Sequence, residues 1–447
     1  MTGSARLAQA GFVLCAVYAG WHLYVLNIAP LETWTFRILH IAGALILGFG
    51  MSAALSVRRA PEGRNGNLAV YLGGVSLVAT LAALGALGAA ILAFKPGEVA
   101  PPDWTLAIYG WALAGGMLLA IGTSWVYPSR PGTLPLTDLA LIAATVASAG
   151  FILFSLDTLS LRLRAGTPFA DPNNGWAAFA MIVLIAELTR RVAGLALVVI
   201  ALVFIAYAFL GPWMPGFLEH KGYDAKRFFT YVFTDNGVLG PTTAVSSTYI
   251  ILFIIFAAFL NTSKVGDYFV NFAFAAAGRA RGGPAKVSVF ASGLMGMING
   301  TSAGNVVSTG SLTIPLMKKV GYRPQSAGAI EAAASTGGQI MPPIMGAGAF
   351  IMAEITGIPY TDLVIAALIP AILYFASIFF MVDFEASRTG MRGMRQEELP
   401  RLSDLARQLS LFLPIFILIG ALFSGYSVIR AGTLAIAAAA VVSWLTP

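Results

Sequence analysis

Long runs of apolar residues follow one another along most of the chain and restrict what it can fold into. The sequence has 447 residues, of which 58% are hydrophobic and only 11% are charged. An average soluble domain is about 25% charged. A helix needs about 20 mainly apolar residues to cross the hydrocarbon core of a membrane, and runs of this length recur. We therefore predict an all-α, polytopic membrane protein embedded in the lipid bilayer.

The formal net charge of +7 does not indicate a nucleic-acid partner. The basic residues fall in short segments between apolar runs, where they act as signals of membrane topology. Their clusters are too small and too scattered to follow a phosphate backbone. The single cysteine, Cys15, excludes an intramolecular disulfide, and the three histidines are too far apart to suggest a metal site.

The first part of the chain predicts a bundle of membrane-spanning helices. Candidate spans occupy residues 11–29, 34–56, 68–93, 104–127 and 135–156. Basic residues after the second and fourth spans place the N-terminus in the cytoplasm; these residues are Arg58, Arg59, Arg64 and Arg130. By the same count, Arg162 and Arg164 fall outside the cell and break the pattern.

The segments that follow are less regular. Residues 176–188 are short for a membrane span and are followed by Arg190 and Arg191. A clear span covers 192–210, and the mixed segment 217–239 is predicted to lie at the membrane interface. A further span covers residues 245–260.

An uncharged stretch between two basic clusters predicts a helical hairpin. The 31 residues 287–317 carry no charge, while Lys286 precedes them and Lys318 and Lys319 follow. If both clusters face the cytoplasm, the chain must enter and leave the membrane on the same side. Each arm then has about a dozen residues, or roughly 18 Å of helix, which is too short to cross the core. We predict a re-entrant hairpin with its tip near residues 299–305.

The residues of the predicted tip are suited to holding a ligand. Unpaired backbone groups cannot face lipid, so the tip must face protein or a water-filled cavity. Glycines permit a tight turn, and hydroxyl and amide side chains add hydrogen-bonding groups; these residues are Asn299, Gly300, Thr301, Ser302, Gly304 and Asn305. An alternative is that Gly296, Gly300 and Gly304 form a small-residue stripe for close helix packing.

The next apolar segment, 325–355, is predicted to be a discontinuous helix. It is interrupted by STGGQ (335–339) and then by Pro342 and Pro343. Proline removes a backbone donor and obstructs the preceding turn of a helix. Two broken elements rich in Ser, Thr, Asn and Gly are typical of the ion and substrate site of a secondary transporter.

Glu331 is a carboxylate inside this apolar segment. A charged residue in a membrane segment is a functional candidate, as a ligand, a proton carrier or the partner of a buried base. The alternative is that Glu331 lies in a cytoplasmic cavity or pairs with Lys318, Lys319 or Arg323.

Three motifs carry a resemblance to a known family. They are RGGPAKV (281–287), NGTSAGNVVSTGSLTIPLMKKVGYRP (299–324) and EAAASTGGQIMPPIMGAGAFIMAE (331–354). Upstream, NGVLGPTTAVSSTYIILFIIFAAFL (236–260) and PGFLEHKGYD (215–224) also fit. With these motifs the chain resembles, over about 190–382, the large membrane subunit of tripartite ATP-independent periplasmic (TRAP) transporters. It is most similar to the fused permeases of the TAXI subfamily.

The resemblance implies a sodium-coupled importer of the elevator type in the bacterial inner membrane. A periplasmic substrate-binding protein would deliver a small organic anion, such as a dicarboxylate, and sodium ions would be the coupling ions, with no other cofactor. Residues 1–160 would be a small-subunit-like scaffold, and 176–382 the first repeat of the large subunit. The implied ion and substrate site comprises Asn299, Gly300, Thr301, Ser302, Asn305, Glu331, Ser335, Thr336, Gly337 and Gln339.

The end of the chain departs from the family pattern. After a polar, amphipathic and cytoplasmic arm at 383–410, residues 411–447 hold only two further spans. They would begin an inverted second repeat whose glycine-rich hairpin and broken helix are absent. The expectation is a fragment, a split subunit whose other half is a partner chain, or a degenerate gene product. A transport-inactive scaffold or channel-like protein is therefore an alternative. A membrane enzyme is not expected, because no histidine or paired carboxylate stands near Ser302 or Ser335 to activate a nucleophile.

Overall fold

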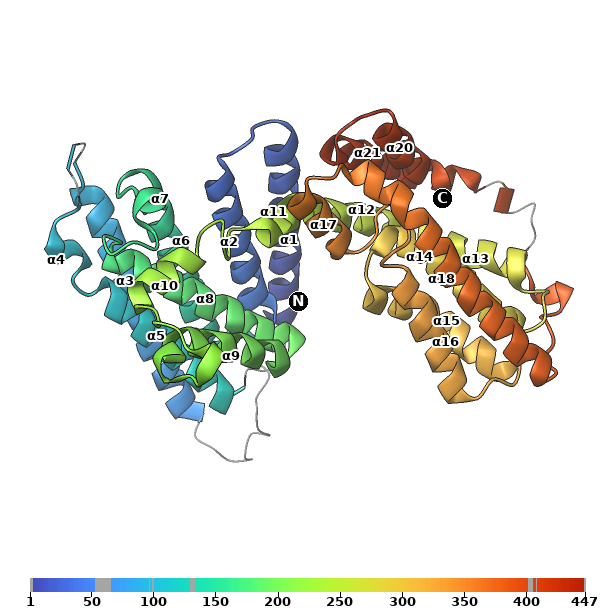
Figure 1. Cartoon of the computed structure of the whole chain (residues 1–447), viewed down its shortest axis with the longest axis horizontal. Coiled ribbons are helices and arrows are strands. Elements are labelled where there is room, and N and C mark those ends of the chain that lie inside the picture. Colours follow the sequence, from blue (N-terminus) through green and yellow to red (C-terminus); the bar gives the residue numbers. More distant parts are fainter. Residues whose placement is uncertain are drawn as a thin grey trace. The chain divides into compact units, whose positions relative to one another are not determined.

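The computed structural model describes residues 3–52, 66–95, 97–98, 100–128, 133–400, 405–406 and 408–445. These residues form helices and connecting segments, with no β-strand among them (Figure 1). The basic residues that were used to orient the first spans, Arg58, Arg59, Arg64 and Arg130, lie outside the described residues.

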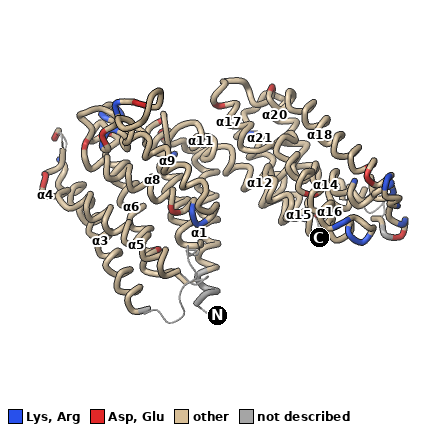
Figure 2. The backbone as a smooth tube through the Cα atoms, turned by 60° about the horizontal axis from the view of Figure 1, so that its bottom comes forward, with Lys and Arg blue, Asp and Glu red and all other residues tan. Residues whose placement is uncertain are grey.

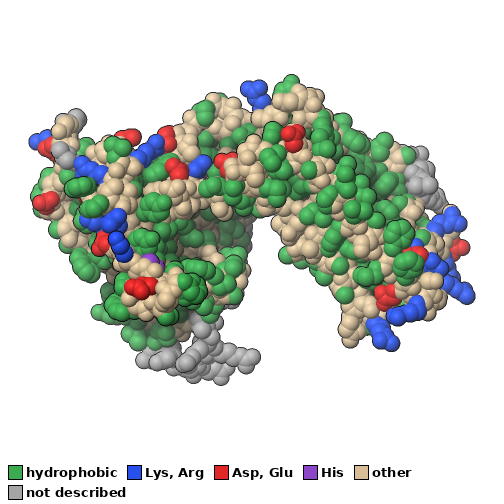
Figure 3. All heavy atoms as spheres, in the orientation of Figure 1, with side chains coloured by type: hydrophobic (Ala, Val, Ile, Leu, Met, Phe, Trp, Pro, Cys, Tyr) green, Lys and Arg blue, Asp and Glu red, His purple; other side chains and the backbone are tan. Residues whose placement is uncertain are grey.

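Within the described ranges, eight helical segments are long and apolar enough to cross a membrane. Large apolar side chains are exposed on many of them, and Figure 3 shows hydrophobic side chains over much of the visible surface. Such a surface is stable in lipid and would associate in water. The prediction of an all-α, multi-pass membrane protein is confirmed.

The chain forms two compact units, which are described separately. The first contains residues 1–20 and 31–243, and the second contains residues 21–30 and 244–447. The first unit therefore extends well beyond residue 160. The proposed limits of small-subunit and large-subunit parts at 160 and 176 stay predictions.

The first unit is a helical bundle around α6. Its core is built largely from alanine, leucine and aromatic side chains of α2, α3, α5, α6 and α8. Tyr109 of α5 and Phe151 of α6, for example, are both fully buried and stack with ring centroids 4.7 Å apart. The helices are α1 (Gly3–Asn27), of which residues 21–27 belong to the second unit, α2 (Thr33–Met51), α3 (Gly66–Ala93), α4 (Asp103–Leu106), α5 (Tyr109–Val126), α6 (Leu136–Asp157), α7 (Leu161–Arg164), α8 (Pro172–Ala193), α9 (Leu195–Leu210) and α10 (Ala225–Val232).

Helix α8 corrects the prediction of a short segment at 176–188, because it has 22 residues. Asp171 caps its N-terminus by accepting bonds from the backbone N–H groups of Asn173 and Asn174. At the other end, Arg190 and Arg191 are buried within the helix. They are tolerated there because both bind the buried carboxylate of Glu187.

Ion pairs gather the connecting segments at one end of the first unit. Arg162 of α7 binds Glu32, between α1 and α2, at 2.5 Å. Arg37 of α2 binds Asp235 at 3.2 Å. The basic segment that broke the predicted charge pattern therefore lies beside acidic partners on the same end of this unit.

The second unit is built around helices α14, α15 and α16, of which α14 and α15 form a hairpin (Figure 1). The chain passes into it within α11 (Pro241–Val245), which continues through one π-helical turn, η3 (Ser246–Ile250), into α12 (Ile251–Thr262). The remaining elements are α13 (Val265–Ala277), α14 (Gly283–Asn299), α15 (Ser302–Lys319), α16 (Pro324–Gly337), α17 (Ala347–Thr356), α18 (Tyr360–Arg388), η4 (Gln396–Glu398), η5 (Leu409–Phe412), α20 (Leu413–Phe423) and α21 (Val428–Leu445).

Helices α14 and α15 occupy the stretch that was predicted as a hairpin. They have 17 and 18 residues, longer than the predicted arms, because both extend into the flanking basic segments. At 1.5 Å per residue each is about 26 Å long, still short of a hydrocarbon core of about 30 Å. The re-entrant course in the membrane stays a prediction.

The segment 325–355 is discontinuous at the predicted place. Helix α16 ends at Gly337 and α17 begins at Ala347, so residues 338–346, with both prolines, separate them. Further on, α18 extends to Arg388, six residues into the predicted arm 383–410. Residues 401–404 and 407 of that arm lie outside the described part of the chain.

Candidate functional site

A fully buried carboxylate lies at the centre of α14, α15 and α16. Glu331 is 0% exposed and accepts hydrogen bonds from five hydroxyl groups. Ser288 Oγ donates to Oε2 at 2.7 Å, and Ser335 Oγ and Ser292 Oγ donate to Oε1 at 3.1 and 3.2 Å. Thr309 and Thr313 of α15 complete the shell. We call these five residues the hydroxyl shell of Glu331.

The hydroxyl shell follows from a spacing of four residues on each helix. Residues four apart lie on the same face of a helix, one turn above each other. Ser288 and Ser292 share a face of α14, Thr309 and Thr313 share a face of α15, and Ser335 follows Glu331 on α16. Three polar faces therefore meet inside an otherwise apolar group of helices.

No basic side chain compensates Glu331 in the described part of the chain. All its hydrogen bonds come from hydroxyl groups, so the alternative that it pairs with Lys318, Lys319 or Arg323 is wrong. The neighbouring Lys286 instead binds Asp383 at 2.5 Å. Removing a charge from water without a counter-charge is costly, and such groups in membrane proteins are usually functional.

Asn305 brings an unpaired oxygen to the same interior. It is fully buried, and its Nδ2 donates to the carbonyl of Ser292 at 2.8 Å and to that of Ser335 at 3.5 Å. Among the described residues, its Oδ1 has no hydrogen-bond partner. Buried polar atoms nearly always have a partner, so an unpaired acceptor indicates room for a donor or a cation.

The hairpin tip packs against the break between α16 and α17. Gly300 takes a left-handed conformation (φ 59°), which ends α14 and turns the chain into α15. Gly296 lies against the backbone of Gly338, and a Cβ at Gly296 would come within 2.2 Å of the Gly338 Cα. The three spaced glycines therefore do not form one packing stripe, because α14 ends before Gly304.

A cavity of about 730 Å³ opens between the hairpin tip, the break, α17 and the first part of α18. Two helices begin at its wall. Thr301 caps α15 by accepting a bond from the N–H of Gly304, and Ser302 and Ala303 line the cavity. At α17, Gly346 is the cap without a side-chain bond, and Ala347 and Gly348 line the cavity. Helix N-termini carry free N–H groups and a positive partial charge, so this wall favours an anion.

The structure divides the ten predicted site residues into groups. Asn305, Glu331 and Ser335 belong to the buried interior. Gly300, Thr301, Ser302 and Gln339 line the tip cavity, and Gln339 Nε2 donates to Ser302 Oγ at 3.0 Å.

The other three predicted residues lie outside both groups. Asn299 ends α14 and does not line the tip cavity. The exposed Thr336 donates to the carbonyl of Ala332 in its own helix. Gly337 packs under Tyr374, where a Cβ would approach a ring atom to 2.5 Å.

Four residues of the hydroxyl shell were missed from the sequence: Ser288, Ser292, Thr309 and Thr313. Each pair has the four-residue spacing that places hydroxyl groups on one helix face. Taken with the same spacing of Glu331 and Ser335, this pattern could have identified them. Only the packing of α14, α15 and α16 shows that the three faces meet.

The motifs of this hairpin and broken helix match a family model. Residues 180–446 match that of the tripartite ATP-independent periplasmic transporter, DctM component. The chain belongs to this family. The match begins earlier and ends later than the resemblance seen in the sequence at 190–382. Members are transport proteins, so the expectation that the chain is not an enzyme is confirmed.

Curated relatives agree with the family. The C4-dicarboxylate TRAP transporter large permease protein DctM of Pseudomonas aeruginosa is 31% identical over 39% of this chain and 40% of its own length. The sialic acid TRAP transporter large permease protein SiaM of Vibrio cholerae is 26% identical over the same shares. The uncharacterized protein y4mL of Sinorhizobium fredii is 28% identical over 35% of this chain and 38% of its own length. The matches thus cover about two fifths of these relatives' lengths.

Proposed function

We propose that the chain is the permease of a sodium-coupled importer that moves a small organic anion, such as a dicarboxylate, across the bacterial inner membrane. A periplasmic substrate-binding protein delivers the anion, and the hairpin with its broken helix moves as the transported unit of an elevator. Membership of the DctM family and a relative named for C4-dicarboxylate support a TRAP system and this substrate class. Sodium, the elevator motion and the TAXI-type fusion are parts of the proposal.

The observation that carries the proposal is the meeting of helix ends of opposite polarity. The N-termini of α15 and α17 open on the tip cavity, and the C-termini of α14 and α16 end beside them. N-termini attract an anion, while carbonyls at the C-termini attract a cation. The volume of about 730 Å³ falls within the usual range for small-molecule sites.

The cation is assigned to the interior behind the tip. The unpaired Oδ1 of Asn305 and the uncompensated carboxylate of Glu331 supply oxygen and negative charge. The carbonyl of Ser335, which faces Asn305, supplies a further oxygen. A sodium ion bound there would balance the charge of Glu331, and solute binding at the tip would then be linked to ion binding.

Solute uptake in proteoliposomes tests this function. The complete permease and its cognate binding protein are reconstituted, and uptake from an organic-acid panel is measured with and without an inward sodium gradient. Asn305→Leu and Ser335→Leu are compared with the control Ser308→Ala, because the hydroxyl of Ser308 donates to the carbonyl of Gly304 on its own helix.

We expect sodium-dependent uptake that both leucine variants weaken and that the control preserves, with equal expression. Unchanged sodium dependence of uptake in both leucine variants would mean that the coupling cation does not bind at Asn305 and Ser335. If the folded wild type takes up none of the panel acids, the inactive scaffold becomes the better account.

A further inference from the structure

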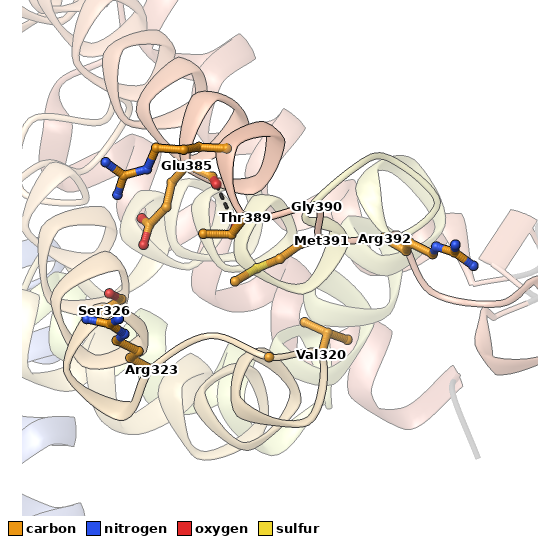
Figure 4. Close-up of a pocket in the computed structure, with 11 residues that line it drawn as sticks. Val320, Arg323, Ser326, Glu385, Thr389, Gly390, Met391 and Arg392 are labelled. Carbon is orange, nitrogen blue, oxygen red and sulfur yellow. Dashed lines mark hydrogen bonds between the residues drawn. The ribbon is translucent and has the colours of Figure 1, made fainter.

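A second cavity lies at the end of the second unit where α15, α16 and α18 meet the segments that follow them (Figure 4). Its volume is about 570 Å³, and it is separate from the tip cavity. Three arginines, Arg323, Arg388 and Arg392, line it together with Glu385 and Ser326. We call it the arginine cavity.

The charged groups of the arginine cavity have no partners within the described residues. Neither Arg323 nor Arg388 makes a side-chain hydrogen bond or ion pair there, and Glu385 makes none with its carboxylate. Basic residues nearby behave differently, since Arg281 and Lys286 both bind Asp383, at 2.7 and 2.5 Å. A cavity with charges of both signs left unpaired suits a ligand that also carries both signs.

Charged residues from two parts of the fold line the cavity: Arg323 precedes α16, whereas Glu385 and Arg388 both lie near the end of α18. Figure 4 shows Arg323 and Ser326 on one side and Glu385 on the other, with the side chain of Arg392 extending away. Ser326 lies in the first turn of α16, whose N-terminus has no side-chain cap. Its hydroxyl and the first-turn N–H groups add donors beside Arg323. Arginine, hydroxyl and helix N-terminus together suit phosphate, and a carboxylate suits an ammonium group.

The surroundings of the cavity favour a lipid over a soluble ligand. Lysines and arginines gather at the ends of α15, α16 and α18, as Figure 2 shows. By the positive-inside rule this end faces the cytoplasm, at the level of the headgroups. On α18, Met381 and Phe384 are 62% and 68% exposed, one turn before Glu385 and Arg388. Residues four apart share a face, so an apolar surface for acyl chains leads to the cavity.

We propose that the arginine cavity binds the phosphoethanolamine headgroup of a membrane phospholipid. Arg323 and Arg388 bind the phosphate, with Ser326 and the start of α16 as further donors. Glu385 binds the ammonium group, and the acyl chains lie along the exposed face of α18. The lipid would join the end of α18 to the connection between α15 and α16.

Native mass spectrometry of the full-length chain in detergent tests this site. Phosphatidylethanolamine, phosphatidylglycerol and phosphatidylcholine with the same acyl chains are added separately, and the lipid retained per protein is measured. We expect retention of phosphatidylethanolamine to exceed that of the other two by about tenfold, the value of one charge-assisted hydrogen bond. Equal or better retention of phosphatidylglycerol would overturn the ammonium site at Glu385.

Variants separate the two halves of the headgroup. Arg323→Gln with Arg388→Gln should lower retention of all three lipids, because each has a phosphate. Glu385→Gln should lower only the retention of phosphatidylethanolamine, to the retention seen with phosphatidylcholine. The control, Arg279→Gln with Lys318→Gln, makes the same charge change at exposed positions outside the cavity lining and should retain lipid like the wild type.

Two further outcomes would contradict the proposal. If the control pair lowers retention as much as the cavity pair, binding is due to general surface charge. If inorganic phosphate displaces phosphatidylethanolamine, the source of the phosphate is not a lipid. Size-exclusion profiles of all variants exclude misfolding as the cause, and the selective loss in Glu385→Gln is a result that misfolding cannot produce.

Discussion

The buried charged side chains of the two units have different partners. In the first unit, Glu187, Arg190, Arg191 and Asp138 are all buried and form three ion pairs of 2.8 Å. Trp125 adds a bond to Glu187 at 3.0 Å. In the second unit, Glu331 is equally buried, but the described residues give it five hydroxyl groups and no basic side chain as partners.

The difference separates a structural role from a functional one. The network of the first unit has two positive and two negative charges, so it is complete and holds α8 to α6 and α5. Hydroxyl groups solvate the carboxylate of Glu331 but cannot neutralise it. A buried charge without a counter-ion is retained where it binds an ion or a proton. The proposed function therefore assigns ion binding to the second unit.

The largest effect on stability is expected from Glu187→Ala. This change leaves Arg190 without its carboxylate and Arg191 with only Asp138, and breaking a buried pair typically costs about 3–5 kcal/mol. Thermal unfolding of the purified chain in detergent measures it. The control is Glu219→Ala, an exposed carboxylate of the same unit. A midpoint for Glu187→Ala equal to that of the control would contradict the structural role.

A smaller effect on stability is expected from Glu331→Gln. The amide keeps the shape of the carboxylate, and the hydroxyl shell can reorient to donate or accept. No buried cation is left unpaired, so the loss should stay below about 1.5 kcal/mol, the upper value for an ordinary hydrogen bond. The same unfolding assay tests it. Destabilisation as large as that of Glu187→Ala would mean that Glu331 is structural.

The smallest effect concerns the exposed pair of Glu32 and Arg162 in the first unit. Burial raises the pKa of Glu32, but bonds from the N–H groups of Thr35 and Trp34 and from Arg162 outweigh it and lower the pKa to about 2. Glu32 therefore stabilises the fold at pH values above 4.5, the pKa of the carboxyl in the unfolded chain. This stabilisation is lost as the pH falls towards 2, the pKa in the folded chain.

The contribution of Glu32 should be below about 1 kcal/mol, since exposed pairs are weak. Unfolding midpoints of wild type and Glu32→Gln between pH 6 and pH 3 measure it. Their difference should shrink as the pH falls. A difference that grows would mean that the sign of the pKa shift is wrong.

Much of the second unit was predictable because local rules govern it. The uncharged stretch between basic clusters indicated the hairpin, and Pro342 and Pro343 indicated the break between α16 and α17. Asn305, Glu331 and Ser335 were selected from residue type and motif, and the structure brings them together.

The rest depends on contacts between helices that the sequence does not contain. In the sequence, Arg190 and Arg191 resemble basic residues of a loop between spans. The structure shows that Asp138, about 50 residues earlier, lies beside Arg191. Nothing local in the sequence distinguishes Ser288 and Thr313 from other helix residues, but in the structure both donate hydrogen bonds to Glu331. Thr336 fitted the motif but lies on the exposed face of α16. In each case tertiary packing, rather than local propensity, decides the role.

The central claim is that the interior around Glu331 and Asn305 binds a sodium ion, and sodium-dependent stabilisation tests it most directly. A ligand that binds only the folded state raises stability in proportion to RT ln(1 + [L]/Kd). Unfolding midpoints of the purified chain are measured in sodium chloride and in choline chloride at equal ionic strength. We predict that sodium raises the midpoint of the wild type and of Ser308→Ala but not that of Glu331→Gln or Asn305→Leu. Equal midpoints of the wild type in the two salts, or sodium stabilisation that survives in both site variants, would contradict the account.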